Sequence, residues 1–172
     1  CTRFCYTGTI RKGKLTGTLY CVGGFDPLLD MNDVKFMVAR LYELGVDTLR
    51  GHIYADRSMK EPVEYGEGWC WDDENPRLTP LSLGRQDTFA ESLLSEMSNM
   101  GIVLQNVSIG EATCPANAHL ICPRFHTIDQ VLERMMKKSD NFFAEAVFYQ
   151  IAASTGKPLS KATDASSIIK QL

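Results

Sequence analysis

The serine, aspartate and asparagine at positions 139–141 are the side chains in this sequence best placed for catalysis. A stretch with helical periodicity ends just before them at Lys138, and an apolar stretch with the same periodicity follows. A corner between two helices is a rigid place from which the Ser139 hydroxyl and the Asn141 carboxamide could face a cleft. Lys138 adds positive charge beside them. A bare S-x-N triplet is nevertheless unspecific, and Ser139 is also expected to be the N-cap of the second helix.

Two S-x-x-K sequences, Ser154/Lys157 and Ser167/Lys170, have the spacing that places a lysine amine one helical turn from a serine nucleophile. Both lie in a polar stretch that lacks the apolar surroundings needed to lower a lysine pKa. Chance alone produces such matches in a chain with this many serines and lysines. We therefore interpret both pairs as solvent-exposed side chains without a catalytic role.

Four side chains that can bind zinc lie close together in the sequence: Cys114, His119, Cys122 and His126. Structural zinc sites usually present paired ligands two to four residues apart, and this spacing fits that pattern poorly. In a strand, His119 and Cys122 would also point to opposite faces. We therefore predict no metal and no other cofactor, and we keep a small zinc-stabilised domain as a weaker alternative.

Composition limits the classes of protein that remain. The 172 residues carry a formal net charge of −3, 44% are hydrophobic and 23% are charged, which is typical of a folded globular chain. The scattered charges offer no basic face for nucleic acid, and no apolar run reaches the ~18 residues of a membrane span. Six cysteines are too sparse for a disulfide scaffold and leave the compartment open. The first residues resemble neither a signal peptide nor a natural start, so we expect a section of a longer chain.

The first part of the chain predicts a sheet with a crossover helix. Residues 4–22 indicate a hairpin whose turn is Lys12-Gly13. Residues 32–44 follow as a helix with Asn32 as the expected N-cap and Gly45 just after its end. Residues 48–55 then form a strand. This strand–helix–strand order favours a partly parallel sheet.

The rest of the chain predicts more helix than strand. Residues 61–84 show little regular pattern but contain both tryptophans, so we expect a functional loop. Helices are expected at 87–100, 127–136 and 139–153, with one more near Asp164, and strand-like segments at 102–109 and 119–122.

Four motifs, in this order, resemble those of the penicillin-binding serine D-alanyl-D-alanine carboxypeptidases and endopeptidases that carry a large inserted domain. Residues 19–27 are similar to LYxxGGGDP, with Phe25 in place of a glycine, and residues 51–56 to GdxxxD. Residues 68–73 are similar to GWxWDD, and residues 135–145 to MxKKSDNxxAE, the second active-site motif. Four ordered motifs are far more specific than any one of them.

The resemblance implies an α/β fold in two parts. Residues 1–112 would be the inserted domain, a mixed sheet with flanking helices. Residues 113–172 would be a helical piece of the transpeptidase/β-lactamase-like peptidase domain that carries the S-x-N motif. The nucleophilic S-x-x-K and the K-T-G motif of the family are expected outside these residues, so this chain alone should be inactive.

The resemblance also implies a reaction in which a serine forms an acyl-enzyme with the peptidoglycan stem peptide and D-alanine leaves. Ser139 would relay the proton to the leaving nitrogen, and Asn141 would hold the substrate amide. Asp73 would bind the free end of the stem-peptide side chain, in a pocket walled by Trp69 or Trp71.

Further expectations concern partners and location. The intact parent would bind β-lactam antibiotics and act in the periplasm or another extracytoplasmic space. The alternative is a non-catalytic module that binds or scaffolds peptidoglycan peptides and whose parent has lost the nucleophile.

Overall fold

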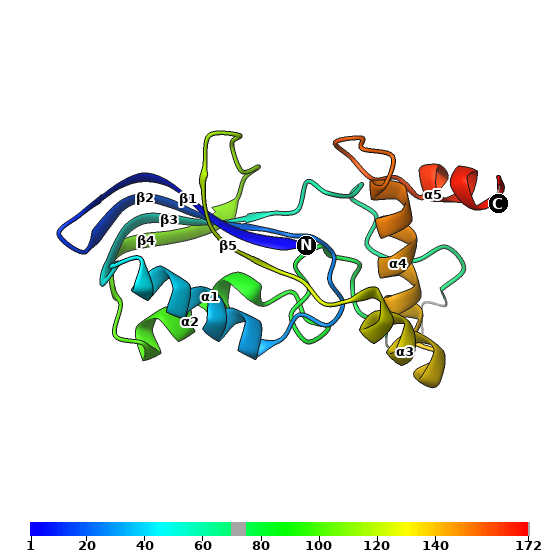
Figure 1. Cartoon of the computed structure of the whole chain (residues 1–172), viewed down its shortest axis with the longest axis horizontal. Coiled ribbons are helices and arrows are strands. Elements are labelled where there is room, and N and C mark those ends of the chain that lie inside the picture. Colours follow the sequence, from blue (N-terminus) through cyan, green and yellow to red (C-terminus); the bar gives the residue numbers. More distant parts are fainter. Residues whose placement is uncertain (70–74, 172) are drawn as a thin grey trace.

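The computed structural model describes residues 1–69 and 75–171. Five strands form one mixed sheet in the order β4-β3-β2-β1-β5, which confirms the predicted α/β class (Figure 1). The strands are β1 (Thr2–Arg11), β2 (Lys14–Val22), β3 (Thr48–Asp56), β4 (Val103–Glu111) and β5 (His119–Arg124). The helices are α1 (Met31–Glu43), α2 (Phe89–Asn99), α3 (Ile128–Lys138), α4 (Asn141–Ala153) and α5 (Ala162–Ile169).

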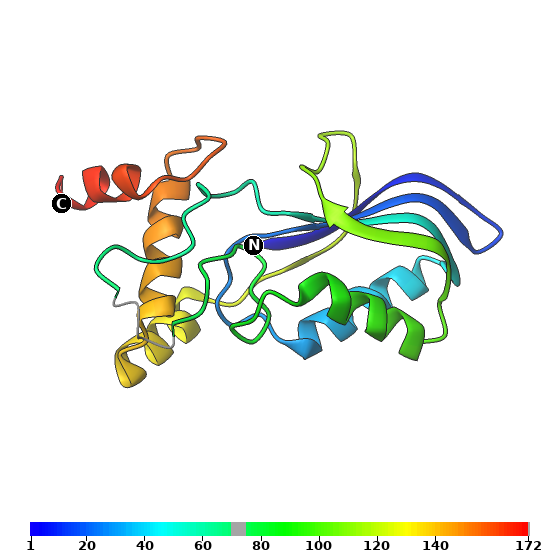
Figure 2. The ribbon, with the colours of Figure 1, turned by 180° about the vertical axis from the view of Figure 1, so that it is seen from behind.

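The sheet combines an antiparallel hairpin with parallel crossovers. β1 pairs antiparallel with β2, and the register ends at Arg11 opposite Lys14, which confirms the turn at Lys12-Gly13. β2, β3 and β4 run parallel, with α1 and α2 as the crossovers. Both helices cover the same face of the sheet (Figure 2). The predicted crossover unit is therefore confirmed, and β5 adds an edge strand beside β1.

The sheet core is built from aliphatic side chains at regular spacing. From the sheet, Leu19, Leu49 and Ile53 are fully buried. From the helices, Met37 of α1 and Leu93 of α2 meet them with no exposed surface. Each such side chain contributes roughly 1.5–3 kcal/mol of hydrophobic free energy on burial, so the residues at helix and strand spacing supply much of the stability of this half.

A row of glycines crosses three neighbouring strands. Gly8 of β1 lies opposite Gly17 of β2, and Gly17 lies opposite Gly51 of β3. Their φ angles are +107°, +158° and +138°, and a Cβ on Gly17 would lie 2.0 Å from the carbonyl oxygen of Thr7. Because the backbones approach this closely, any side chain in the row would clash with backbone atoms. The strands curve along their length (Figure 1), and such glycine rows permit a sheet to bend.

The helices α3, α4 and α5 lie beyond one end of the sheet (Figures 1 and 2). Their core is mainly aromatic, with Phe142, Phe143 and Tyr149 buried on α4. Phe25, from the turn after β2, inserts between them, with its ring centroid 5.8 Å from those of Phe142 and Tyr149. Phe25 has a φ of +51°, a conformation that favours glycine. The motif LYxxGGGDP, which this segment resembles, has glycine at this position.

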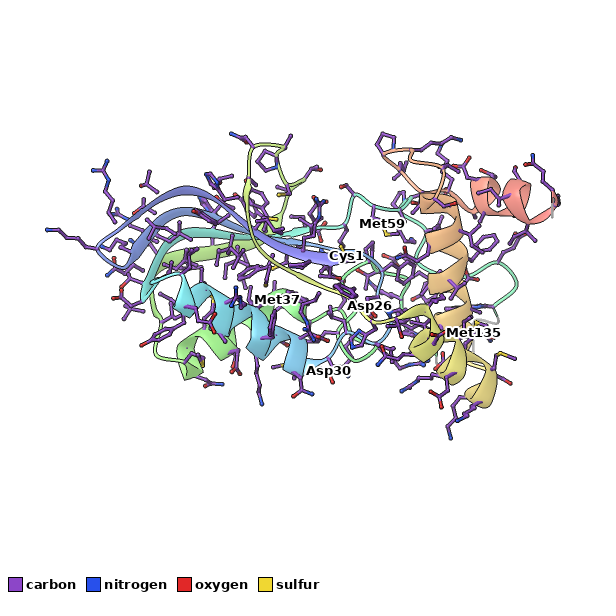
Figure 3. All side chains as sticks on the ribbon, in the orientation of Figure 1. Cys1, Asp26, Asp30, Met37, Met59 and Met135 are labelled. Carbon is purple, nitrogen blue, oxygen red and sulfur yellow. The ribbon has the colours of Figure 1, made fainter. Side chains whose placement is uncertain are left out.

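Asp26 connects the sheet to the helices, and it lies between them in Figure 3. Its carboxylate accepts hydrogen bonds from the backbone N–H and the ring Nδ1 of His126, both at 2.9 Å. The same side chain accepts from the Leu28 N–H at 3.0 Å. The turn after β2 therefore fixes the chain just before α3 begins.

Two predicted N-caps are wrong, each by one or two residues. α1 begins after Asp30, whose carboxylate accepts from the Asn32 and Asp33 N–H groups, so Asn32 lies inside the first turn. α4 begins after Asp140, whose carboxylate accepts from the Phe142 N–H, and not after Ser139. In each case two polar residues that can cap a helix lie within two positions of each other, and the aspartate is the one that caps the helix. The capping box of Thr127 and Gln130 on α3 is confirmed.

In the described part of residues 61–84 no helix or strand forms, as predicted, and the segment passes beside α4 (Figure 1). No helix within residues 1–69 and 75–171 has the length and hydropathy needed to cross a membrane. The division of the chain at residue 112 stays a prediction. The sheet itself takes its edge strand β5 from beyond that position.

Candidate functional site

The corner between α3 and α4 has a defined backbone geometry. α3 ends at Lys138, and Ser139 adopts the left-handed conformation with φ 48° and ψ 46°. The backbone N–H groups of Ser139 and Asp140 both donate to the carbonyl of Met135. Met135 is labelled near this corner in Figure 3. α4 then begins at Asn141, so the two predicted catalytic residues flank the turn on either side.

Asp140, the middle residue of the triplet, fixes the corner. One carboxylate oxygen caps α4 by accepting from the Phe142 N–H at 3.2 Å. The other accepts from the Arg85 guanidinium at 2.5 Å and lies 3.7 Å from Nε of Arg134. The Asp140 side chain is only 9% exposed, so this ion pair is shielded from water better than a surface pair and holds the turn in place.

The predicted catalytic side chains at this corner face solvent. Ser139, Asn141 and Lys138 are all exposed. The Ser139 hydroxyl and the Asn141 carboxamide make no hydrogen bond to any residue that the structure describes. A hydroxyl can accept and pass on a proton, and a carboxamide can both donate to and accept from a peptide bond. The corner therefore presents two unused polar groups on a rigid support.

The helices beneath the corner form an aromatic platform. Phe142 and Phe143 contact each other edge to face with their centroids 6.3 Å apart. The guanidinium of Arg85 lies over the Phe142 ring at 5.6 Å, and that of Arg134 lies over Phe143 at 4.9 Å. The two arginines that bind Asp140 are therefore also stacked on the helical core, which restricts their side chains.

Trp69 lies on the same core as the corner. It is half-buried and packs against the cluster that contains Phe142, as Met135 also does. The approach is close at Gly66, where an added Cβ would lie 2.4 Å from Oε1 of Glu145 and 2.6 Å from the Trp69 indole nitrogen. The structure therefore brings the loop that carries Trp69 against α4. The other predicted binding residues of this loop, Trp71 and Asp73, lie outside the described residues.

A pocket of about 460 Å³ lies between this loop and α4. Glu145, on its wall, is one helical turn from Asn141 and on the same face of α4. Aromatic rings and carboxylates dominate the lining, which includes Tyr65, Glu67, Phe148 and Tyr149. Such a lining suits a ligand that carries positive charge. On α4 the lining begins at Ala144, about one turn after Asn141, and no residue of the triplet lines the pocket.

A buried lysine and a half-buried glutamate lie close to Tyr149 of this pocket, and of the two only the glutamate lines it. Lys60 is 5% exposed, donates to the carbonyls of Glu61 and Val63, and lies 4.8 Å above the Tyr149 ring. Burial lowers the pKa of Lys60, opposed by the nearby carboxylates. Burial also raises the pKa of Glu145, which Lys60 partly offsets. Each group therefore favours the charged form of the other.

Neither S-x-x-K sequence forms a catalytic pair in the structure. The Ser154 hydroxyl donates to the carbonyl of Ile151 at 2.7 Å, and Lys157 pairs with Asp164. The Ser167 hydroxyl donates to the Thr163 carbonyl at 2.8 Å. All four serine and lysine side chains are exposed, so their interpretation as solvated surface residues is confirmed.

The four possible zinc ligands have separate surroundings. The His119 ring packs on Tyr6, Cys122 is buried in the sheet core, and His126 bonds to Asp26. Cys114 lies in the loop between β4 and β5. Within residues 1–69 and 75–171, no group of three or more potential ligands is arranged to hold a metal ion.

Sequence reasoning did not identify Asp140, Arg85 and Glu145 as parts of this site. Asp140 carried a detectable signal, because an aspartate between two helices is a strong N-cap. Arg85 carried none, since it reaches Asp140 across 55 positions of sequence. Glu145 was within the quoted motif, but its burial against Gly66 depends on the fold of the loop.

Comparison with known proteins gives consistent matches. The family model described as the D-Ala-D-Ala carboxypeptidase 3 (S13) family matches residues 1–82 and 82–172. A D-alanyl-D-alanine carboxypeptidase of Actinomadura sp. (strain R39) is 35% identical over 66 residues, which are 38% of this chain and 12% of that protein. The match to the family model covers both the sheet and the corner.

Solved structures share the fold. The crystal structure of penicillin binding protein 4 from Haemophilus influenzae superimposes with a TM-score of 0.86 at 16% identity, covering 99% of this chain and 56% of that one. A second structure of that protein, complexed with a novel β-lactam, gives a TM-score of 0.72 at 17% identity over 99% of this chain and 55% of the other. The chain thus spans about half of this structural relative and a smaller share of the curated one.

Proposed function

Because the chain belongs to the D-Ala-D-Ala carboxypeptidase 3 (S13) family, we propose that it is part of a serine-type carboxypeptidase acting on peptidoglycan stem peptides. In this reaction a serine hydroxyl attacks the carbonyl of the penultimate D-alanine and forms an ester. The terminal D-alanine leaves as an amine, and water then hydrolyses the ester. The nucleophile and the oxyanion donors come from parts of the parent outside these 172 residues, so the chain alone hydrolyses nothing.

The corner supplies the second set of catalytic groups. Ser139 accepts the nucleophile's proton and passes it to the leaving nitrogen, while Asn141 holds the substrate amide. Lys138 adds positive charge that favours a substrate carboxylate. The observation that carries this proposal is the pair of exposed, unused polar groups on a turn that Asp140 and Arg85 hold rigid. Rigid placement of this kind is what acid–base catalysis requires.

The loop at residues 66–73 binds the stem-peptide side chain. Trp69 lies against the helical core, beside the pocket that Glu145 lines. We assign Asp73 to the free amino end of that side chain, with Trp71 or Trp69 as a wall. The carboxylates of the pocket favour the same positive charge. This assignment places the stem peptide along α4 from Asn141 towards Glu145.

The proposed reaction places the intact protein in the periplasm or another extracytoplasmic space, where peptidoglycan is found. It also makes β-lactams ligands of the parent, because they acylate the same nucleophile. One of the similar structures is that of a protein complexed with a β-lactam, which supports this part of the proposal.

The test uses the full-length parent and a fluorescent penicillin. We expect labelling of a serine in the parent, and we expect Ser139→Ala to slow acylation by about 10²–10⁴-fold, as for the loss of an acid–base group. Ser154→Ala is the matched control, since that hydroxyl only bonds to a backbone carbonyl, and its acylation rate should not change.

A folded parent that takes up no label would overturn the enzymatic proposal. In that case the parent would be titrated with a D-alanyl-D-alanine peptide. Binding of the peptide, with a lower affinity in Asp73→Ala, would support the non-catalytic binding module. Equal acylation rates in the wild type and in Ser139→Ala would instead remove Ser139 from the reaction while leaving the enzyme class intact.

A further inference from the structure

The cysteines in the sheet are divided between its two faces. Cys21 and Cys122 are buried in the core between the sheet and α1 and α2. Cys5 lies on the opposite face, in a small cluster with Tyr20 and Val22. Its neighbours across the strands, Tyr20 on β2 and Leu120 on β5, are not cysteines.

The loop between β4 and β5 crosses this second face. It rises on the side of the sheet away from α1 and α2 (Figure 1). Asp56, at the end of β3 and 4% exposed, accepts from the Cys114 N–H at 2.7 Å. The side chain of Cys114 then packs against the cluster that contains Cys5. A buried carboxylate therefore sets where this cysteine lies.

The two thiols lie close together. Cys114 packs into the cluster that contains Cys5, although more than one hundred residues separate them in the sequence. Cys21 and Cys122 cannot compete for Cys5, because each lies opposite Phe4 and points to the other face of the sheet. A disulfide requires Cβ vectors that face each other, so Cys114, which packs on the same face as Cys5, suits it and these two cysteines do not.

We propose that Cys5 and Cys114 are a redox-active pair that closes to a disulfide when the protein meets a disulfide-bearing oxidant. The Cys114 thiolate attacks a sulfur of the oxidant and forms a mixed disulfide, releasing one thiol of the oxidant. The Cys5 thiolate then attacks the Cys114 sulfur of the mixed disulfide and releases the second thiol of the oxidant. The pair loses two electrons and two protons, and the oxidant's disulfide is reduced to two thiols. This inference is independent of the proposed reaction.

The environment of each thiol fixes the order of these steps. Burial raises the pKa of Cys5 to about 11. Burial also raises the pKa of Cys114, and the nearby Cys5 partly offsets that rise. Cys114 is also the more exposed of the two. Cys114 therefore meets the oxidant first, and the reaction should accelerate as the pH rises towards 9.

The bond would tie the β4–β5 loop to β1. It closes a loop of more than one hundred residues, and a bridge of this length restricts the unfolded chain strongly. We expect the oxidised chain to melt about 5–10 °C above the reduced one.

The experiment treats the purified chain with oxidised glutathione at pH 8.5 and maps its peptides without reduction. The expected product is a peptide containing Cys5 joined to one containing Cys114, with the rise in melting temperature reversed by reductant. Cys114→Ser should abolish both effects. Cys122→Ser is the matched control, and its oxidised form should keep the bridge.

Three outcomes would overturn the proposal. One is a bridge from Cys114 to Cys1 or Cys70, and another is a bridge from Cys5 to Cys21. The third is a chain that stays fully reduced, or carries only glutathione on Cys114, after complete exposure to the oxidant. Because Cys114 lies in a loop, its serine variant should fold, and circular dichroism of that variant checks this directly.

Discussion

The sheet half of the molecule (β1–β5 with α1 and α2) and its helical half (α3–α5 with the loops against them) are stabilised in different ways. The core of the sheet half consists mainly of aliphatic side chains that recur at strand and helix spacing. The core of the helical half is mainly aromatic and takes members from distant segments, such as Phe25 after β2 and Leu78 in the loop. The first core follows from local pattern, and the second depends on how separate segments meet.

This difference matters because the candidate catalytic corner lies in the helical half. Ser139 and Asn141 owe their positions to Asp140, and Asp140 owes its position partly to Arg85, which comes from the far side of the irregular loop. A site built in this way is sensitive to changes made far from it in sequence. Substitutions at Phe25, Asp140 and Glu145, each with a matched variant, test the comparison and are given from the largest expected effect to the smallest.

Phe25→Gly separates backbone strain from packing at the junction of the two halves. Glycine relieves the left-handed backbone by about 1–2 kcal/mol, but removing the buried ring costs about 3–5 kcal/mol. We expect the free energy of unfolding to fall by about 1–4 kcal/mol, measured by denaturant titration. Hydrogen exchange should show the loss in α3 and α4.

Leu19→Ala is the matched change in the sheet half and should cost about 2–5 kcal/mol, with faster exchange in α1 and the strands. If Phe25→Gly instead stabilised the protein, backbone strain would outweigh packing at that position. If both variants changed exchange everywhere to the same extent, the two halves would unfold as one unit and the comparison would fail.

Asp140→Ala should lower the free energy of unfolding by about 1–3 kcal/mol, because it removes both the cap of α4 and the partner of Arg85. Asp140→Asn keeps a good cap and loses only the charge, so it should cost less than the alanine variant. The same denaturant titration measures both. Equal losses in the two variants would show that capping contributes nothing and that the ion pair alone fixes the corner.

Glu145→Gln should have the smallest effect, visible as a change in pH dependence. Burial raises the pKa of Glu145 above its usual 4.5, so the folded protein holds this proton more tightly than the unfolded chain. The ionisation of Glu145 therefore lowers the free energy of unfolding as the pH rises from 4.5 through the raised pKa of the folded state. Glu145→Gln removes that fall, as melting curves between pH 4 and pH 7 would show.

Glu133→Gln serves as the control for that measurement, because Glu133 is exposed on α3 and pairs only with Lys137 among the described residues. Its melting curves should follow those of the wild type across the same range. A Glu145→Gln protein whose melting temperature kept the wild-type dependence on pH would show that another group causes it.

Sequence reasoning recovered what local chemistry determines. The hairpin, the parallel crossover and the capping box of Thr127 and Gln130 each depend on residues close together in the chain. It missed which of two neighbouring polar residues caps a helix, at Asp30 and at Asp140, because both candidates can accept the same hydrogen bonds. It could not have found the contact of Arg85 with Asp140, because nothing in the spacing of those residues indicates that they meet.

The row formed by Gly8, Gly17 and Gly51 has a consequence for how this chain tolerates changes in length. The three glycines meet only because the strands are in one fixed register. Inserting or deleting a single residue in a strand before its glycine would move that glycine out of the row by one position. A residue with a side chain would then take its place, where the neighbouring backbones leave no room for a Cβ. The strands on either side of this row should therefore accept substitutions far more readily than insertions or deletions.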